Sequence, residues 1–326
     1  MPVRNHSLNI CPSTDKLGLS LRFFHRNVKP QISAIKRTNK LDKVTTLRLT
    51  TDILKLDSPL IEARIKRFIK DYMKTCGASG VVIGISGGLD SSTTAALASS
   101  SIDGRRVLGV AMPEEETYNV THTKHAKLVA KKFGFDLQTI DISPILRACY
   151  KSIPIYEKAD KLSKGNLKAR VRMVYLYYYA NKLNRLVCGS SDKSETMMGY
   201  FTKWGDVAAD ISPIMDLYKT QVKQLALHIG VPKGIVAKPP TPALWPDQLA
   251  EEELGIKYET LDLILYGLEH FMEPEEIAKQ LDLASKFVRG IKQRWLAAEH
   301  KRRLPLTTKL GYRTVGADFR LPYKSG

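Results

Sequence analysis

The sequence predicts an α/β protein with a doubly wound parallel sheet, helices on both faces of the sheet and a mostly helical C-terminal third. Three observations predict this fold. Short apolar runs alternate with segments of helical periodicity. A glycine-rich turn follows the first of these runs. The chain has 326 residues, of which 43% are hydrophobic and 26% charged, so it is long enough and apolar enough to bury a sizeable core.

The elements follow one another in a regular order. A first helix is predicted between Leu60 and Met73, where apolar residues recur every three or four positions. Four short apolar runs then predict strands, at residues 81–85, 106–112, 137–142 and 185–188. Helical patterns at 121–133 and 167–183 lie between them, which favours parallel strands. Residues 256–298 are predicted to be helical and residues 311–323 irregular.

The first 50 residues differ in composition from the rest. They hold ten Lys and Arg residues but only two acids, Asp15 and Asp42, and they show no sustained period. We predict a basic, disordered extension at 1–50 and a single folded domain at 51–326. The extension resembles an organellar targeting peptide, although a plain disordered tail accounts for the same residues. We therefore expect a cytoplasmic protein and leave organellar targeting open.

Composition also limits the class of function. No apolar run approaches the ~20 residues of a membrane helix, so no membrane partner is expected. The four cysteines are scattered without a CxxC pair, which disfavours a zinc site or a disulfide framework. The formal charge of +18 invites a nucleic-acid interpretation, but a large share of it lies in the first 50 residues. Because anionic small substrates explain the remaining charge equally well, no nucleic-acid partner is expected.

The glycine-rich turn is a candidate phosphate loop. It reads GISGGLDS, follows a predicted strand and leads into a small-residue helix, yet it matches neither GxGxxG nor the Walker A pattern. Adjacent glycines let backbone N–H groups approach a phosphate, and the flanking serines add hydroxyl donors. The following helix presents its positive N-terminal end. The predicted loop consists of Gly84, Ile85, Ser86, Gly87, Gly88, Leu89, Asp90 and Ser91.

Asp90 needs its own explanation, because a carboxylate repels phosphate oxygens. It can instead bind Mg²⁺, which bridges to those oxygens and cancels the charge. That arrangement suits a leaving pyrophosphate. The alternative is a Gly-Gly-Leu-Asp turn in which Asp90 is only the N-cap of the helix.

The loop resembles the pyrophosphate loop of the N-type ATP pyrophosphatases, which adenylate a substrate oxygen and then displace AMP. Further segments are similar to those of one branch, the NAD synthetases, and occur in the same order from about residue 60 to the end. They are GNLKARVRM (165–173), GSSDKSE (189–195), GYFTKWGD (199–206), LYKTQV (217–222), KPPTPALW (238–245), EEELG (251–255) and HKR (300–302). The resemblance implies the adenine nucleotide alpha hydrolase-like version of the predicted fold.

The resemblance also implies roles for individual residues. It assigns Mg²⁺ to Asp90 and Glu195. It adds Ser190, Lys219 and Thr241 to the loop as contacts of the co-substrate ATP. It places the dinucleotide deamido-NAD at Arg170, Lys203, Asp210, His300 and Lys301, and it leaves Arg172 as a possible ATP contact. No side-chain nucleophile is implied, so we expect no covalent catalytic residue.

The implied reaction is the amidation of deamido-NAD to NAD. The nicotinate carboxylate is adenylated by ATP with release of pyrophosphate, and ammonia then displaces AMP. We expect ammonia rather than glutamine as donor, since the 79 residues before Gly80 are too few for a glutaminase domain. A homodimer is implied as well.

Three departures from the family pattern concern turnover. The run at 247–251 lacks a hydroxyl and an acid in an expected active-site flap, Val207 replaces a usual glycine, and Asp192 replaces a usual asparagine. Two alternatives therefore stay open. One is another adenylating synthetase, such as a tRNA-thiolating enzyme, although Cys188 has no partner cysteine placed for a persulfide relay. The other is a degenerate, non-catalytic ATP-binding protein, which would have no need of both metal carboxylates.

Overall fold

The structure of the protein is a computed structural model that describes residues 47–315. Most of the predicted basic extension and the last part of the predicted irregular tail lie outside this range. The extension and the domain boundary at residue 50 therefore stay predictions.

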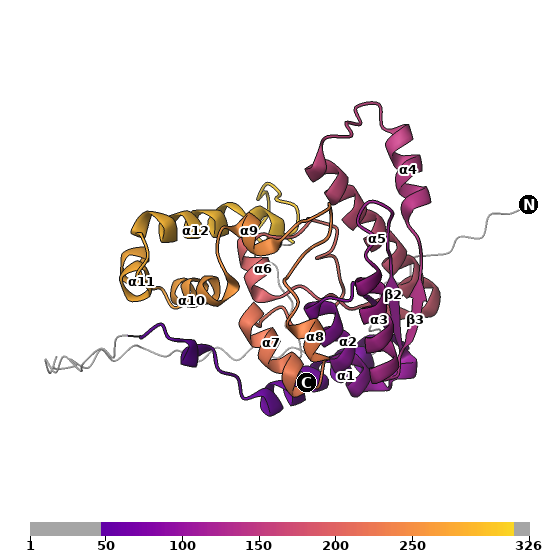
Figure 1. Ribbon diagram of the computed structural model, residues 1–326, viewed down its shortest axis with the longest axis horizontal. Helices are drawn as coiled ribbons and strands as arrows, with labels where there is room; N and C mark the ends of the chain where they lie inside the picture. The colour runs from indigo at the N-terminus through magenta and orange to yellow at the C-terminus, as the bar shows by residue number, and fades with distance from the viewer. Residues whose placement is uncertain (1–46, 316–326) are drawn as a thin grey trace, which may run out of the picture. The chain divides into compact units, whose positions relative to one another are not determined.

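A parallel sheet of four strands forms the centre of the described fold (Figure 1). Its strands are β1 (Gly80–Gly84), β2 (Val107–Ala111), β3 (Asp136–Thr139) and β4 (Arg185–Val187), in the spatial order β3-β2-β1-β4. Each strand overlaps one of the four predicted runs, so the predicted parallel sheet is confirmed. The chain moves outward from β1 to β3 and then returns to the other side of β1. This reversal beside β1 is the point at which such sheets bind ligands.

Helices cover both faces of the sheet, as predicted. On one face α1 (Ser58–Cys76), α2 (Leu89–Ile102), α3 (Val120–Phe133) and α7 (Lys219–His228) pack against Val81 and Ile83. On the other face α4 (Ser143–Ser152) and α5 (Lys161–Leu183) pack against Val82 and Leu108. Successive strand residues thus enter different cores, because side chains alternate across a strand.

Local sequence sets the ends of the longer helices. Asp57 caps α1 by accepting a hydrogen bond from the Leu60 N–H at 3.1 Å, and Gly77 ends it in the left-handed conformation at φ 68°. Asp160 caps α5 in the same way, and Asn184 ends that helix at φ 51°. These ends put the start of β1 and the start of β4 at the same edge of the sheet.

The C-terminal part is helical, as predicted. It contains α10 (Tyr258–Glu269), α11 (Pro274–Leu281) and α12 (Ser285–Ala297), followed by the short α13 (Glu299–Arg302). Three more short helices precede them: α6 (Lys193–Met198), α8 (Lys233–Val236) and α9 (Ala250–Leu254). Single 3₁₀ turns occur at Thr51–Leu54 and Gly104–Arg106.

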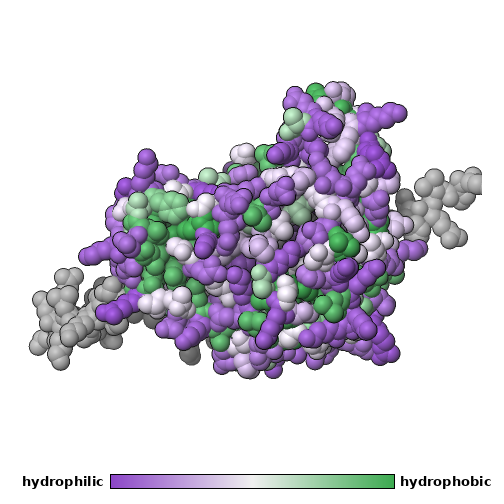
Figure 2. All heavy atoms as spheres, in the orientation of Figure 1, coloured by the Kyte–Doolittle hydropathy of each residue, from purple (hydrophilic) through white to green (hydrophobic). Residues whose placement is uncertain are grey.

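The view in Figure 2 is mostly hydrophilic, with a hydrophobic patch over the end formed by α10, α11 and α12. Exposed apolar side chains in this region include Phe271, Phe287 and Leu296. None of them lines the cavities described below. Within the described range, every helix is too short or too polar to span a lipid bilayer.

Gly109 in β2 lies where no side chain fits. A Cβ atom there would approach the Phe135 ring to 2.7 Å and Ile85 Cγ1 to 2.9 Å. We expect Gly109→Ala to lower the free energy of unfolding by about 1–3 kcal/mol, measured by urea denaturation. Gly290→Ala is the matched control, because it faces open space within α12 and is expected to stabilise slightly. Equal effects of the two substitutions would contradict this packing argument.

Candidate functional site

Two adjoining cavities open at the carboxyl edge of the sheet. The larger, of about 290 Å³, is lined by residues that follow β1, β2 and β4 and by the segment 241–244. The smaller, of about 100 Å³, lies against the glycine-rich loop and the start of α7. Both cavities are lined by Ser86, Asp90, His122, Glu195 and Tyr200, so together they form one elongated site.

The predicted ATP-binding residues gather here, with one exception. The larger cavity is lined by Gly84, Ile85, Ser86, Asp90, Ser91, Ser190 and Thr241, and the smaller adds Gly88, Leu89 and Lys219. Gly87 lines neither cavity. It is turned toward His122, whose carbonyl oxygen would lie 2.3 Å from a Cβ at this position, and its φ is 75°. Gly87 therefore shapes the loop through its backbone.

Asp90 lies in the first turn of α2, while Gly88 takes the N-cap position. The alternative in which Asp90 is only a helix cap is therefore wrong. Gly88 offers no side-chain cap, which leaves N–H groups at this helix start available to an anion.

Three carboxylates meet beside the loop. Oxygen atoms of Asp90, Asp192 and Glu195 lie within 4.8 Å of one another. The Nζ atom of Lys219 lies 2.8 Å from Asp90, 2.6 Å from Asp192 and 2.9 Å from Glu195. The structure thus brings together the two acids predicted to share a metal ion. It also adds a third acid, Asp192, at the position where the family usually has asparagine.

Helix starts hold this cluster in place. Asp192 is the N-cap of α6 and accepts a hydrogen bond from the Glu195 N–H at 2.8 Å. Lys219 is the first residue of α7, and its N–H donates to Ser194 Oγ at 2.9 Å. Ser194 in turn donates to the buried carboxylate of Asp262 on α10 at 2.5 Å. Hydrogen bonds therefore tie α6, α7 and α10 together behind the carboxylates.

Burial and charge perturb these groups strongly. Burial raises the pKa of Asp192, and it raises the pKa of Glu195 well above the ordinary value with help from the neighbouring Asp192. Burial alone would lower the pKa of Lys219. The surrounding acids, of which Asp192 has the largest effect, outweigh burial and hold the pKa well above its normal value. Three carboxylates and one ammonium leave a deficit of positive charge.

The cluster suits a hard divalent cation. Carboxylate oxygens are the ligands that Mg²⁺ prefers, and the excess negative charge matches such an ion. Asp90 Oδ1 is buried and, among the described residues, has no hydrogen-bond partner. Because a buried acceptor without a partner is costly, this atom is a natural ligand position.

Four of the five predicted dinucleotide residues lie together around the segment 199–203. Arg170 Nη2 donates to the Lys203 carbonyl at 3.3 Å, and Lys203 Nζ donates to the His300 carbonyl at 2.6 Å. Lys301 Nζ donates to the Gly199 carbonyl at 2.5 Å. This chain of contacts joins α5, the segment after α6 and α13.

Asp210 takes no part in these hydrogen bonds and makes its own contacts beside β4. Its Oδ2 atom accepts a hydrogen bond from the Val187 N–H at 2.7 Å, and its Oδ1 atom lies 3.4 Å from the Tyr177 hydroxyl. Arg172, two residues beyond Arg170, lines the larger cavity and donates to the Met112 carbonyl at 3.2 Å. The two arginines thus donate to different parts of the chain, and their division between dinucleotide and ATP stays a prediction.

Several cavity residues had no assigned role at the level of sequence. His122 lines both cavities, and burial, together with Lys238 and His125, lowers its pKa to about 4, so its imidazole is neutral at physiological pH. Tyr200 donates a hydrogen bond to Glu253 at 2.5 Å. His122 belongs to none of the family-like segments, and no signal in the sequence marked it.

The altered flap, residues 247–251, runs into α9. Ala250, within this run, is buried and lines the smaller cavity. The effect of this departure on turnover stays a prediction.

A parallel sheet with a glycine-rich loop after its central strand and an acidic cluster beside that loop defines an α/β nucleotide-binding protein of the N-type ATP pyrophosphatase class. Within that class the chain belongs to the NAD synthase family, whose model matches residues 61–305.

Individual relatives are similar over most of the chain. An NH(3)-dependent NAD(+) synthetase of Hyperthermus butylicus is 47% identical over 79% of this chain and 94% of its own length. The corresponding protein of Methanocaldococcus jannaschii is 47% identical over 76% and 95%. Among solved structures, an NMN synthetase from Francisella tularensis is 32% identical with a TM-score of 0.70, covering 78% of this chain and all of its own. An NH3-dependent NAD synthetase from Campylobacter jejuni is 28% identical with a TM-score of 0.66 and the same coverage.

Lys219 is the only counter-charge in contact with the three carboxylates among the described residues. We expect Lys219→Met to lower the free energy of unfolding by about 3–5 kcal/mol at pH 8 without divalent cations, because buried charges lose their partner. The loss should shrink toward pH 5. An acid whose pKa is higher in the folded state than its unfolded value of about 4 binds a proton more readily in the folded state. Such an acid therefore destabilises the fold more as the pH rises above about 4, and less at pH 5 than at pH 8.

Urea denaturation of variant and wild type at both pH values measures this difference. Lys223→Met is the control, since its half-exposed ion pair with Glu259 is worth less than about 1 kcal/mol. A deficit that does not change between pH 5 and pH 8 would refute the electrostatic account.

Proposed function

We propose that this chain converts deamido-NAD to NAD, using ATP and ammonia and releasing AMP and pyrophosphate. The observation that carries the proposal is the meeting of Asp90 and Glu195 at the carboxyl edge of the sheet, beside cavities lined by the glycine-rich loop. Membership of the NAD synthase family supports the choice of substrate.

In this proposal ATP occupies the elongated site. Backbone N–H groups of the loop and the start of α2 bind its phosphates, with the hydroxyl of Ser86 beside them. Ser190 and Thr241 line the larger cavity and contact the rest of the nucleotide. Lys219 points its ammonium at the phosphate end, where the smaller cavity lies.

Asp90 and Glu195 would hold Mg²⁺, with Asp192 as an additional acidic neighbour. The ion would supply charge neutralisation for the departing pyrophosphate. The ammonium of Lys219, in contact with the same carboxylates, would add positive charge for the same purpose. Both functions depend on the short distances within the cluster.

The reaction has two steps. A carboxylate oxygen of the nicotinate forms a bond to the α-phosphorus of ATP while the bond to pyrophosphate breaks. Ammonia then forms a bond to the activated carbonyl carbon, loses a proton and expels AMP. The protein's contribution is alignment and charge stabilisation. We assign Arg170, Lys203, Asp210, His300 and Lys301 to the dinucleotide.

We further propose a homodimer, in line with the family resemblance. A second candidate substrate is the mononucleotide form of the same acid, since one similar solved structure is an NMN synthetase. Both substrates present the same nicotinate carboxylate to the adenylating site.

A steady-state assay tests the function. Wild-type protein is supplied with ATP, Mg²⁺ and either ammonium or glutamine, with deamido-NAD or nicotinate mononucleotide as acceptor, and pyrophosphate and the amidated product are measured. We expect NAD with ammonium and little with glutamine. Pyrophosphate release that requires tRNA would favour another adenylating synthetase. ATP binding without turnover of either acceptor would favour a degenerate enzyme.

Asp90→Asn removes a carboxylate while leaving Lys219 two partners. We expect turnover to fall at least ~100-fold, because metal binding and charge stabilisation at the pyrophosphate are lost. The melting temperature should change little. Undiminished NAD formation by this variant would exclude the metal role of Asp90.

Arg170→Ala tests the dinucleotide assignment. Arg170 is exposed and makes a single long hydrogen bond among residues 47–315, so its removal should hardly affect stability. We expect the KM for deamido-NAD to rise about tenfold, with the KM for ATP unchanged. A rise in the KM for ATP alone would move Arg170 to the other substrate.

A further inference from the structure

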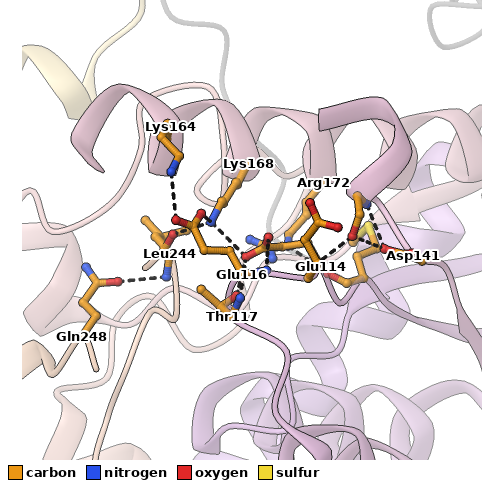
Figure 3. A network of polar contacts seen from close by, with 12 residues as sticks. Glu114, Glu116, Thr117, Asp141, Lys164, Lys168, Arg172, Leu244 and Gln248 are labelled. Atoms are coloured by element: carbon orange, nitrogen blue, oxygen red, sulfur yellow. Dashed lines mark hydrogen bonds and ion pairs between the residues drawn. The ribbon is translucent and has the colours of Figure 1, made fainter. Parts of the chain in front are cut away.

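A second buried lysine, Lys168 on α5, joins two walls of the larger cavity (Figure 3). Its side chain is fully buried. The Nζ atom donates to Glu114 at 2.9 Å and to Glu116 at 2.6 Å, both in the segment that follows β2. It also donates to the main-chain carbonyl of Leu244 at 2.9 Å. All three ammonium protons therefore have an acceptor.

The acceptors on the β2 side are held rigidly. Glu114 also accepts hydrogen bonds from the Thr117 N–H at 3.0 Å and the Thr117 hydroxyl at 2.6 Å. Burial would raise the pKa of Glu114, but these hydrogen bonds and Lys168 outweigh it and hold the pKa below normal. Glu116 receives a further contact from Lys164 at 2.8 Å. The segment after β2 therefore holds the Lys168 ammonium firmly on one side of its contact with Leu244.

The other wall is the loop 239–249, which contains neither helix nor strand. Its ends are joined by a hydrogen bond from the Ala250 N–H to the Pro240 carbonyl at 3.1 Å. Two residues of the loop, Ala243 and Asp247, have positive φ values of 49° and 57°, which L-residues rarely adopt. Inside the loop, the Leu244 N–H donates to Gln248 Oε1 at 2.9 Å, and outside contacts add to this support.

Gly165, one turn before Lys168 on α5, provides a second contact with the same loop. A Cβ atom there would lie 3.1 Å from Leu244 Cβ and 3.3 Å from the Trp245 ring. The missing side chain lets the loop approach α5 closely enough for Lys168 to reach the Leu244 carbonyl. Gly165 and Lys168 together form a seat for the loop.

We propose that Lys168 is a positioning residue that seats the loop 239–249 against α5 and so sets the affinity for ATP. The proposal rests on the proposed function, in which ATP occupies the larger cavity. Thr241 to Leu244 line that cavity, as do Pro113 and Thr117 to Asn119 on the β2 side. A buried ion pair stabilises a fold no better than well-packed apolar residues, so holding a loop is the better reason for this lysine.

The expected signature is a change in KM without a matching change in kcat. When the binding-competent conformation is only partly populated, the apparent affinity falls by that fraction. Saturating ATP selects the seated loop and restores turnover. A merely structural residue would instead lower the melting temperature and the active fraction, leaving the KM for ATP unchanged.

The test compares Lys168→Met and Gly165→Ala with Lys164→Met as matched control. Lys164→Met removes a neighbouring lysine from Glu116 but leaves the Leu244 contact intact. Gly165→Ala disturbs the seat without touching any charge and keeps a good helix former, so it tests the proposal even if Lys168→Met does not fold. The KM for ATP, the KM for deamido-NAD and kcat are measured for each.

We expect Lys168→Met to raise the KM for ATP about tenfold and Gly165→Ala to raise it several-fold. The kcat, the KM for deamido-NAD and all constants of Lys164→Met should stay within about twofold. Unchanged KM for ATP in both seat variants would overturn the proposal. Titration calorimetry with α,β-methylene-ATP separates the proposed function from the proposed seat. No binding to the wild type would refute the proposed function. Equal binding to the wild type and to the seat variants would refute the seat alone.

Discussion

One ammonium group among three carboxylates holds the candidate site together. Lys219 lies within 2.9 Å of Asp90, Asp192 and Glu195, and these four residues come from three separate helix starts. Without the lysine, the acids would repel one another in a poorly solvated place. With it, they stay close enough to share a cation while an excess of negative charge remains. The position of α6 and α7 against the glycine-rich loop depends on this balance.

The second buried lysine obeys the same physics at the other end of the site. Lys168 has a complete set of acceptors only when the segment after β2 and the loop 239–249 are both in place. A buried charge without partners is costly. Each lysine therefore requires segments that are distant in sequence to lie close enough to supply its acceptors. Lys219 lines the smaller cavity, and Lys168 contacts Leu244 in the wall of the larger one.

Much of the fold and part of the candidate site could be predicted from the residue pattern. The apolar runs predicted all four strands, including the largely exposed edge strand β3, and the loop at 84–91 was predicted at the sheet edge because it follows the first run. The pairing of Asp90 with Glu195 was also predicted. Asp192 was treated only as a departure from the family pattern. Its role as N-cap and ion-pair partner depends on where α7 begins in space, and periodicity does not specify that.

The sequence by itself determined the alternation of strands and helices, the position of the glycine-rich loop and the family, because these depend on local periodicity and on residues close together in the chain. Only the tertiary structure decided which charges meet. The partners of Lys168 lie 52 to 76 residues away, and Asp90 is 129 residues from Lys219. Such contacts depend on how the helices pack around the sheet edge, so the contacts of Asp210 beside β4 and the close approach of the loop 239–249 to α5 emerge only in the folded chain.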